Sequence, residues 1–169
     1  MKILNIFVAS LANYKNSYHY TFYKNINNIY QINGSYSILN YNKYADPLKY
    51  GTKARRKVKY SYHKKGTIED HHIIPKEFEK HKLLKEINFH VCCSNNIYIM
   101  PPVGRMIHNE TIYHTNHRLY NEYVKEHLNN ILVKNKDKDS KKYEFILFFN
   151  NLRALLDKND DYLSTLFKY

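Results

Sequence analysis

The sequence predicts an α+β fold in which two short strands precede a helix. Two apolar stretches, residues 71–75 (HHIIP) and 96–100 (NIYIM), have the length of strands, and each is closed by proline, which cannot continue a central strand. From Leu119 onward, apolar residues recur at intervals of three and four, the spacing of an amphipathic helix. The expected order is strand, excursion, strand, loop and helix.

The remaining elements follow from the same patterns. Residues 77–87 are expected to form a short helix or an irregular excursion between the strands. The helix is expected over residues 119–132, with Thr115 or Asn116 as its N-cap, because both side chains can accept a hydrogen bond from the first turn. Residues 134–142 (KNKDKDSKK) have the composition of a charged linker, and the phenylalanines and leucines of 145–156 predict a second amphipathic helix.

These elements divide the chain into three parts. Residues 1–50 are rich in Asn, Tyr and Ser and predict an N-terminal arm or half-domain without a recognisable motif. Residues 51–133 hold both strands and the first helix, preceded by a basic segment, and residues 134–169 hold the charged linker and the C-terminal helix.

The composition favours a polyanionic partner. Against 15 Asp and Glu, the chain has 27 Lys and Arg, which gives a formal charge of +12. A charge of this size attracts nucleic acid first and anionic membrane surfaces second. Residues 53–65 (KARRKVKYSYHKK), which include Arg55 and Arg56, combine cations with tyrosines, a pattern typical of phosphate contact and base stacking. A solvated loop or edge strand is the alternative for this segment.

The apolar stretches and the two cysteines argue against a membrane-spanning protein and against a disulfide-stabilised one. No stretch is long enough to cross a bilayer. Residues 1–12 (MKILNIFVASLA) resemble a signal peptide only weakly, because their apolar run is short and interrupted. Cys92 and Cys93 are adjacent, so they cannot build a disulfide framework, and we expect two buried thiols on a strand. We therefore expect an intracellular protein without membrane contact.

The histidines carry the chemistry. His71 and His72 are neighbours on the first predicted strand, so their side chains point to opposite faces and can have different roles. His114 and His117 are three residues apart where the helix begins. Phosphodiester hydrolysis needs a base for the attacking water and positive charge on the leaving oxygen. Neutral imidazole, with an ordinary pKa of about 6.5, suits the base, and a divalent cation supplies the charge.

Three segments together resemble the HNH, or His-Me finger, endonuclease superfamily. They are residues 70–75 (DHHIIP), 96–101 (NIYIMP) and 114–124 (HTNHRLYNEYV). Within it, the sequence is most similar to the AHH branch of predicted nucleases and toxin domains. That branch has a histidine pair before Ile-x-Pro, an Asn five residues before a proline, and His-x-x-His-x-x-Tyr-Asn entering a helix. The resemblance covers roughly residues 68–128.

The resemblance implies a fold and a set of roles. The fold is a ββα-metal finger core, here with an N-terminal extension and C-terminal helices. His71 matches the metal ligand on the first strand, and His72 matches the general base that activates water. Asn96 matches the residue that braces the finger loop and the base. His117, with His114 as second candidate, matches the metal ligand on the helix. The implied activity is a metal-dependent endonuclease, with DNA favoured over RNA and Mg²⁺ or Mn²⁺ as cofactor, Zn²⁺ or Ni²⁺ being alternatives.

One residue departs from the pattern of this branch. Asp70 stands where the alanine of the AHH motif is expected, either as a carboxylate that holds a histidine or as an exposed side chain. His108 is an alternative to His114 as the second protein ligand. Arg105, Arg118 and Lys76 flank the predicted site and are candidate phosphate contacts, because guanidinium groups bind phosphate oxygens in a bidentate manner.

Two other classes of function remain open on the sequence alone. A non-catalytic nucleic-acid-binding module of the same fold would bind in a salt-sensitive manner and cut nothing. A structural zinc protein would unfold when its metal is chelated.

Overall fold

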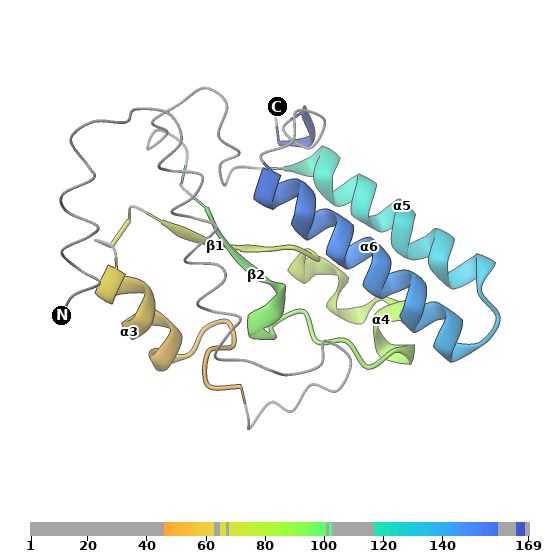
Figure 1. Ribbon diagram of the computed structural model, residues 1–169, viewed down its shortest axis with the longest axis horizontal. Coiled ribbons are helices and arrows are strands. Elements are labelled where there is room, and N and C mark those ends of the chain that lie inside the picture. Colours follow the sequence, from red (N-terminus) through yellow and green to blue (C-terminus); the bar gives the residue numbers. More distant parts are fainter. Residues whose placement is uncertain are drawn as a thin grey trace.

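A two-stranded antiparallel hairpin forms the centre of the structure, a computed structural model that describes residues 46–62, 65–66, 68–100, 102, 117–158 and 165–167 (Figure 1). Strand β1 is Glu69–His72 and strand β2 is Ile97–Met100, with His71 opposite Tyr98 and His72 opposite Ile97. The first strand thus ends before Ile73 rather than at Pro75. The order of strand, strand and helix is as predicted, and the α+β class is confirmed.

Short helices fill the excursion between the strands. They are the 3₁₀ helix η1 at Lys76–Lys80, the helix α4 at Lys82–Glu86 and the 3₁₀ helix η2 at Ser94–Asn96. The predicted short helix over 77–87 is therefore present as two pieces. Cys92 and Cys93 lie in the turn before η2 and not on a strand, and both are free thiols, of which only Cys93 is buried.

Two long helices pack against each other on one side of the hairpin (Figure 1). Helix α5 is Arg118–Lys134, and helix α6 is Lys138–Lys158. Both bury one face in the main core, and each fully buried apolar side chain in such a face contributes about 1.5–3 kcal/mol. The buried residues of α5 are Tyr120, Val124, Leu128 and Ile131, and those of α6 are Phe145, Phe148, Phe149, Leu152 and Leu156.

The charged linker predicted at 134–142 is wrong for most of its length, because only residues 135–137 separate the two helices. Helix α6 begins early because the Asp137 carboxylate accepts hydrogen bonds from the Ser140 N–H at 2.8 Å and the Ser140 hydroxyl at 2.6 Å. Such an N-cap lets the lysine-rich turn join the helix. The N-cap of α5 is His117, one or two residues later than predicted.

A third helix covers the opposite face of the hairpin. Helix α3 is Lys53–Tyr62, so the basic segment is helical rather than a loop or an edge strand. A second, smaller apolar cluster joins Leu48, Ile68 and Ile99 there, with Val58 of α3 packed against it. The hairpin therefore lies between α3 and the α5–α6 pair (Figure 1).

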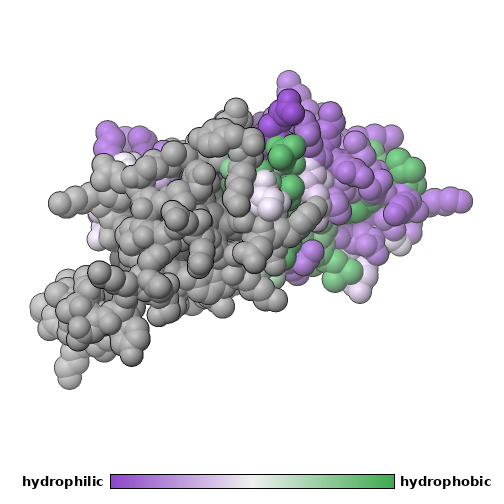
Figure 2. All heavy atoms as spheres, turned by 90° about the horizontal axis from the view of Figure 1, so that it is seen from above, coloured by the Kyte–Doolittle hydropathy of each residue, from purple (hydrophilic) through white to green (hydrophobic). Residues whose placement is uncertain are grey.

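The surface of the described helices is mostly hydrophilic, with smaller apolar areas among the polar side chains on the face that Figure 2 presents. Within the described ranges, no helix is long and apolar enough to cross a membrane.

Candidate active site

His71 lies at the centre of an aromatic cluster between the hairpin and α5. It has no solvent exposure. Its ring centroid is 5.0 Å from that of His117, with the two rings nearly perpendicular at 85°. Tyr120 and Phe167 complete the cluster, each with its ring centroid 5.3 Å from that of His71. The fold thus brings together two of the residues that the sequence predicts as metal ligands, one from a strand and one from the start of a helix.

The ring of His117 is held by its own helix. Its Nδ1 lies 2.8 Å from Oδ1 of Asn121, one turn further along α5. Because an amide oxygen only accepts, Nδ1 carries the proton in this pair, so in the neutral ring Nε2 is the nitrogen with the lone pair. This tautomer is the one that a histidine needs to bind a metal through Nε2. Asn121 was not predicted as a site residue, although it lies four residues after His117 on a helix, a spacing that could have indicated the contact.

His72 faces the other side of β1. Adjacent strand residues alternate, so its ring points away from the His71 cluster and toward the side that α3 covers. There the ring centroid of His72 is 4.5 Å from that of Tyr50, at an interplanar angle of 62°. His72 is half-buried, in contrast to the fully buried His71. The two adjacent histidines therefore occupy different environments, as the sequence predicts for residues with different roles.

Asn96 ties the end of the hairpin together from a fully buried position. Its Oδ1 accepts from the Ile74 N–H at 2.7 Å, and its Nδ2 donates to the carbonyls of Ile74 at 2.9 Å and Val91 at 2.7 Å. Its own carbonyl accepts from the Ile73 N–H at 2.8 Å. The backbone that follows His72 is thus fixed by one side chain, which is the geometry a brace requires.

Helix α5 fixes the same backbone from the other side. The buried Tyr120 hydroxyl donates to the carbonyl of Ile73. Burial raises the pKa of this hydroxyl, so it remains a donor across the physiological pH range. Tyr120 is fully buried and belongs to the core.

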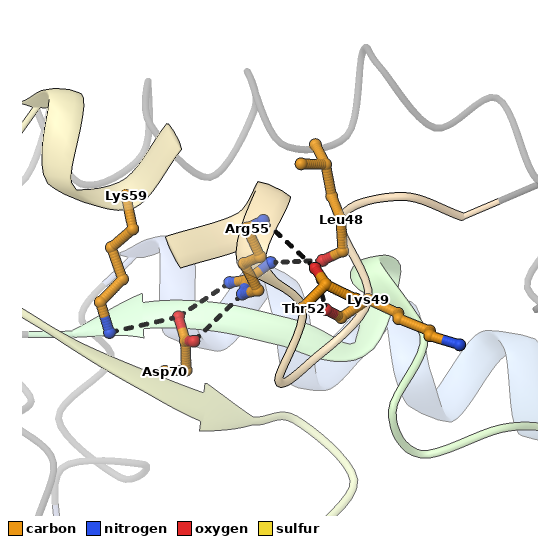
Figure 3. A network of polar contacts seen from close by, with 6 residues as sticks. All are labelled: Leu48, Lys49, Thr52, Arg55, Lys59 and Asp70. Atoms are coloured by element: carbon orange, nitrogen blue, oxygen red, sulfur yellow. Dashed lines mark hydrogen bonds and ion pairs between the residues drawn. The ribbon is translucent and has the colours of Figure 1, made fainter. Parts of the chain in front are cut away.

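Arg55 is not available to nucleic acid. It is fully buried, and its Nε and Nη2 donate to the two carboxylate oxygens of Asp70 at 3.1 and 2.9 Å. Lys59 adds a third positive group, with Nζ 3.8 Å from Oδ1 of Asp70 (Figure 3). The expectation of a phosphate contact at Arg55 is therefore corrected, because its donors are already taken inside the protein. Among the described residues Asp70 holds no histidine, and its side chain is only 12 % exposed, so both expectations for it are also wrong.

The other predicted cationic contacts lie on the surface. Arg56 and Lys76 are exposed, and Arg118, with 81 % of its side chain exposed, forms an ion pair with Glu122 one turn away at 3.3 Å. Three residues named from the sequence, Arg105, His108 and His114, lie outside the described residues.

Within the described ranges, no group of three or more His, Cys, Asp or Glu side chains is arranged to hold a metal ion. His71 and His117 therefore form a group of two candidate ligands among these residues.

Comparison with known families settles the class of protein. Residues 53–156 match a nuclease family of the HNH/ENDO VII superfamily with a conserved AHH motif. The chain belongs to this AHH family. The match extends well beyond the resemblance seen in the motifs, from the first residue of α3 almost to the end of α6. No curated protein and no solved structure shows significant similarity to the chain.

Membership of the AHH family makes the chain a nuclease of that superfamily, with nucleic acid as the substrate class. His71 and His72 supply the two histidines of the AHH motif, and Asp70 stands at its alanine. Tyr50, which contacts His72, precedes the matched residues, and no pattern in the sequence marked it out.

Proposed function

We propose that this chain is a metal-dependent endonuclease that hydrolyses phosphodiester bonds with His72 as general base. The observation that carries the proposal is the arrangement of the three histidines. His71 and His117 face each other across the junction of strand and helix, while His72 leaves the same strand toward a less buried side. In a chain of a nuclease family, His71 and His117 can then act as metal ligands while His72 accepts a proton.

His71 and His117 are the residues that would hold the metal ion, with His114 as the second candidate on the helix side. The donor set fits a divalent ion because the ring centroids of the two imidazoles are 5.0 Å apart, and the contact with Asn121 favours the neutral tautomer of His117 in which Nε2 is the metal donor. A bound ion would supply positive charge for the phosphate and the departing 3′ oxygen. Few protein ligands favour Mg²⁺ or Mn²⁺, and imidazole also suits Zn²⁺ or Ni²⁺.

His72 accepts the proton of the water that attacks phosphorus in line. Its backbone is held within a narrow range of positions because Asn96 fixes the residues that follow it. A base must lie within hydrogen-bonding distance of the proton that it removes, so this bracing contributes to the rate without contact with the substrate. Asn96 acts in this proposal as a positioning residue.

The exposed cations near the hairpin bind the substrate backbone. Arg118 adjoins His117, Lys76 follows β1 by a few residues, and Arg56 lies on the exposed side of α3. Arg105 remains a candidate on the sequence alone. We favour DNA over RNA as the substrate. The net charge of +12 gives the long-range attraction that brings a polyanion to these side chains.

The direct test is cleavage by the purified protein of plasmid DNA and of structured RNA, each with Mg²⁺, Mn²⁺, Zn²⁺, Ni²⁺ or EDTA. The proposal expects cleavage with a divalent ion, none with EDTA, and products that carry 5′-phosphate and 3′-hydroxyl ends, which DNA ligase rejoins without further treatment. Salt-sensitive binding without cleavage of either substrate in any metal would favour the non-catalytic module instead.

A further inference from the structure

The segment before helix α3 reaches the proposed general base. The aromatic rings of Tyr50 and His72 are in edge-to-face contact, with their centroids 4.5 Å apart. Its ring is also 5.6 Å from Nζ of Lys76, a distance at which a cation is attracted to an aromatic face. Tyr50 is 39 % exposed, so its ring is held by neighbours on one side and open on the other.

The backbone of this segment is anchored to the turn that precedes β2. The Tyr50 N–H donates to the carbonyl of Cys92 at 2.9 Å. The buried Asp46 carboxylate accepts from the Ser94 N–H at 2.8 Å and from the Leu48 N–H at 3.2 Å. Contacts of Tyr50 itself and of the residues before it therefore fix the direction in which its side chain leaves the backbone.

A second anchor comes from the residue that replaces the family's alanine. Asp70 lies on the same face of β1 as His72, two residues away, and pairs with Arg55. Arg55 also donates from Nη1 to the carbonyl of Leu48 at 3.2 Å (Figure 3). The Asp70–Arg55 ion pair thus connects the strand that carries His72 to the segment that carries Tyr50.

We propose that Tyr50 is a positioning residue for His72, which restricts the imidazole to the orientation from which it removes the proton of water. The inference rests on the proposed function of His72. An edge-to-face contact between aromatic rings has a preferred geometry and is favourable beyond the area that it buries. The role needs the ring of Tyr50 and not its hydroxyl, so phenylalanine is expected to replace it and alanine is not.

Steady-state cleavage kinetics of three variants test this role. Tyr50→Ala is expected to lower kcat about 10- to 100-fold, since a displaced catalytic group costs rate even at small displacements. Its KM and that of Tyr50→Phe should stay within about threefold of wild type, and Tyr50→Phe should also keep kcat within that range. Tyr143→Ala removes a tyrosine from α6 that is 62 % exposed, and serves as the control with unchanged kinetics.

Two kinetic results would overturn the inference. One is a kcat for Tyr50→Ala that equals that of Tyr143→Ala. The other is a raised KM with an unchanged kcat, which would mean that Tyr50 binds nucleic acid directly instead of orienting His72.

A nuclear magnetic resonance experiment on histidine-labelled protein decides the point without cleavage. The ring signals of His72 are assigned by their loss in His72→Ala. In Tyr50→Ala they are expected to shift and broaden as the imidazole samples other rotamers, while the His117 signals stay in place; Tyr50→Phe keeps them sharp. Loss of the Tyr50 ring shifts the His72 signals in any case, so His72 signals in Tyr50→Ala that shift but stay as sharp as in Tyr50→Phe would refute the positioning role alone. A wild type that cuts neither DNA nor RNA would refute the proposed nuclease mechanism alone.

Discussion

Replacement of Asp70 by alanine restores the family's motif and, on this structure, destabilises the protein. The Asp70 side chain is 12 % exposed and that of Arg55 is 1 % exposed, so the ion pair between them is shielded from water. Asp70→Ala leaves the buried guanidinium of Arg55 without its carboxylate partner, while its hydrogen bond to the carbonyl of Leu48 remains. A buried charge that loses its partner costs far more than an exposed one.

The size of the effect follows from this burial. Breaking one side of a buried pair typically lowers the free energy of unfolding by 3–5 kcal/mol, and we expect about 3 kcal/mol for Asp70→Ala, because Asp70 retains slight exposure. The double variant Asp70→Ala/Arg55→Met removes the stranded charge and fills its volume, so its loss should fall to about 1 kcal/mol. The single variant is therefore expected to be less stable than the double variant.

Urea unfolding followed by far-ultraviolet circular dichroism measures both losses, because the helices dominate that signal and the chain has no tryptophan. The control is Asp139→Ala, which breaks the exposed pair with Lys142 on α6 and should cost at most about 1 kcal/mol. A loss for Asp70→Ala no larger than that of Asp139→Ala, or a double variant that is no more stable than Asp70→Ala, would refute the reasoning.

Asn96→Ala is expected to lower the free energy of unfolding by about 3–5 kcal/mol, because three buried backbone groups lose their partners; a loss below about 1 kcal/mol in urea unfolding would contradict the bracing role. Asn121→Leu is expected to weaken Mn²⁺ or Zn²⁺ binding about tenfold or more in calorimetric titration, whereas the control Asn129→Leu, on the same helix, leaves it unchanged. Equal affinities for the two variants would argue against the hydrogen bond to the ligand ring. Burial raises the pKa of Cys93 to about 12, so this thiol should resist iodoacetamide near pH 8 until urea unfolds the protein; rapid labelling in the native state, located by mass spectrometry, would contradict its burial.

Local patterns predicted the hairpin and the helices of the core because their apolar residues follow the periods of strand and helix. The opposite orientation of His71 and His72 followed from strand geometry alone. Helix α3 was not predicted because its buried face includes two charged residues, Arg55 and Lys59. Their burial depends on the carboxylate of Asp70, which lies eleven or more residues further along the sequence. A charged residue is predicted to lie on the surface when the partner that permits its burial is not known.

The contacts of the candidate site divide in the same way. Its motif residues could be named from the sequence, because the chemistry of phosphodiester hydrolysis selects their types and spacing. Tyr50 could not, since its contact with His72 depends on how the segment before α3 is anchored to Cys92 and Ser94. Such a contact between distant parts of the chain leaves no local pattern.

The most direct test of the central claim compares nicking of supercoiled plasmid by wild type and His72→Ala in Mg²⁺ and Mn²⁺, with EDTA as the metal-free condition and His90→Ala as a control at an exposed histidine. Wild type and the control are expected to nick the plasmid only with metal, and His72→Ala should be about 10²–10⁴-fold slower while its circular dichroism spectrum is unchanged. A folded His72→Ala variant that nicks as fast as wild type would contradict the assignment of His72 as the general base.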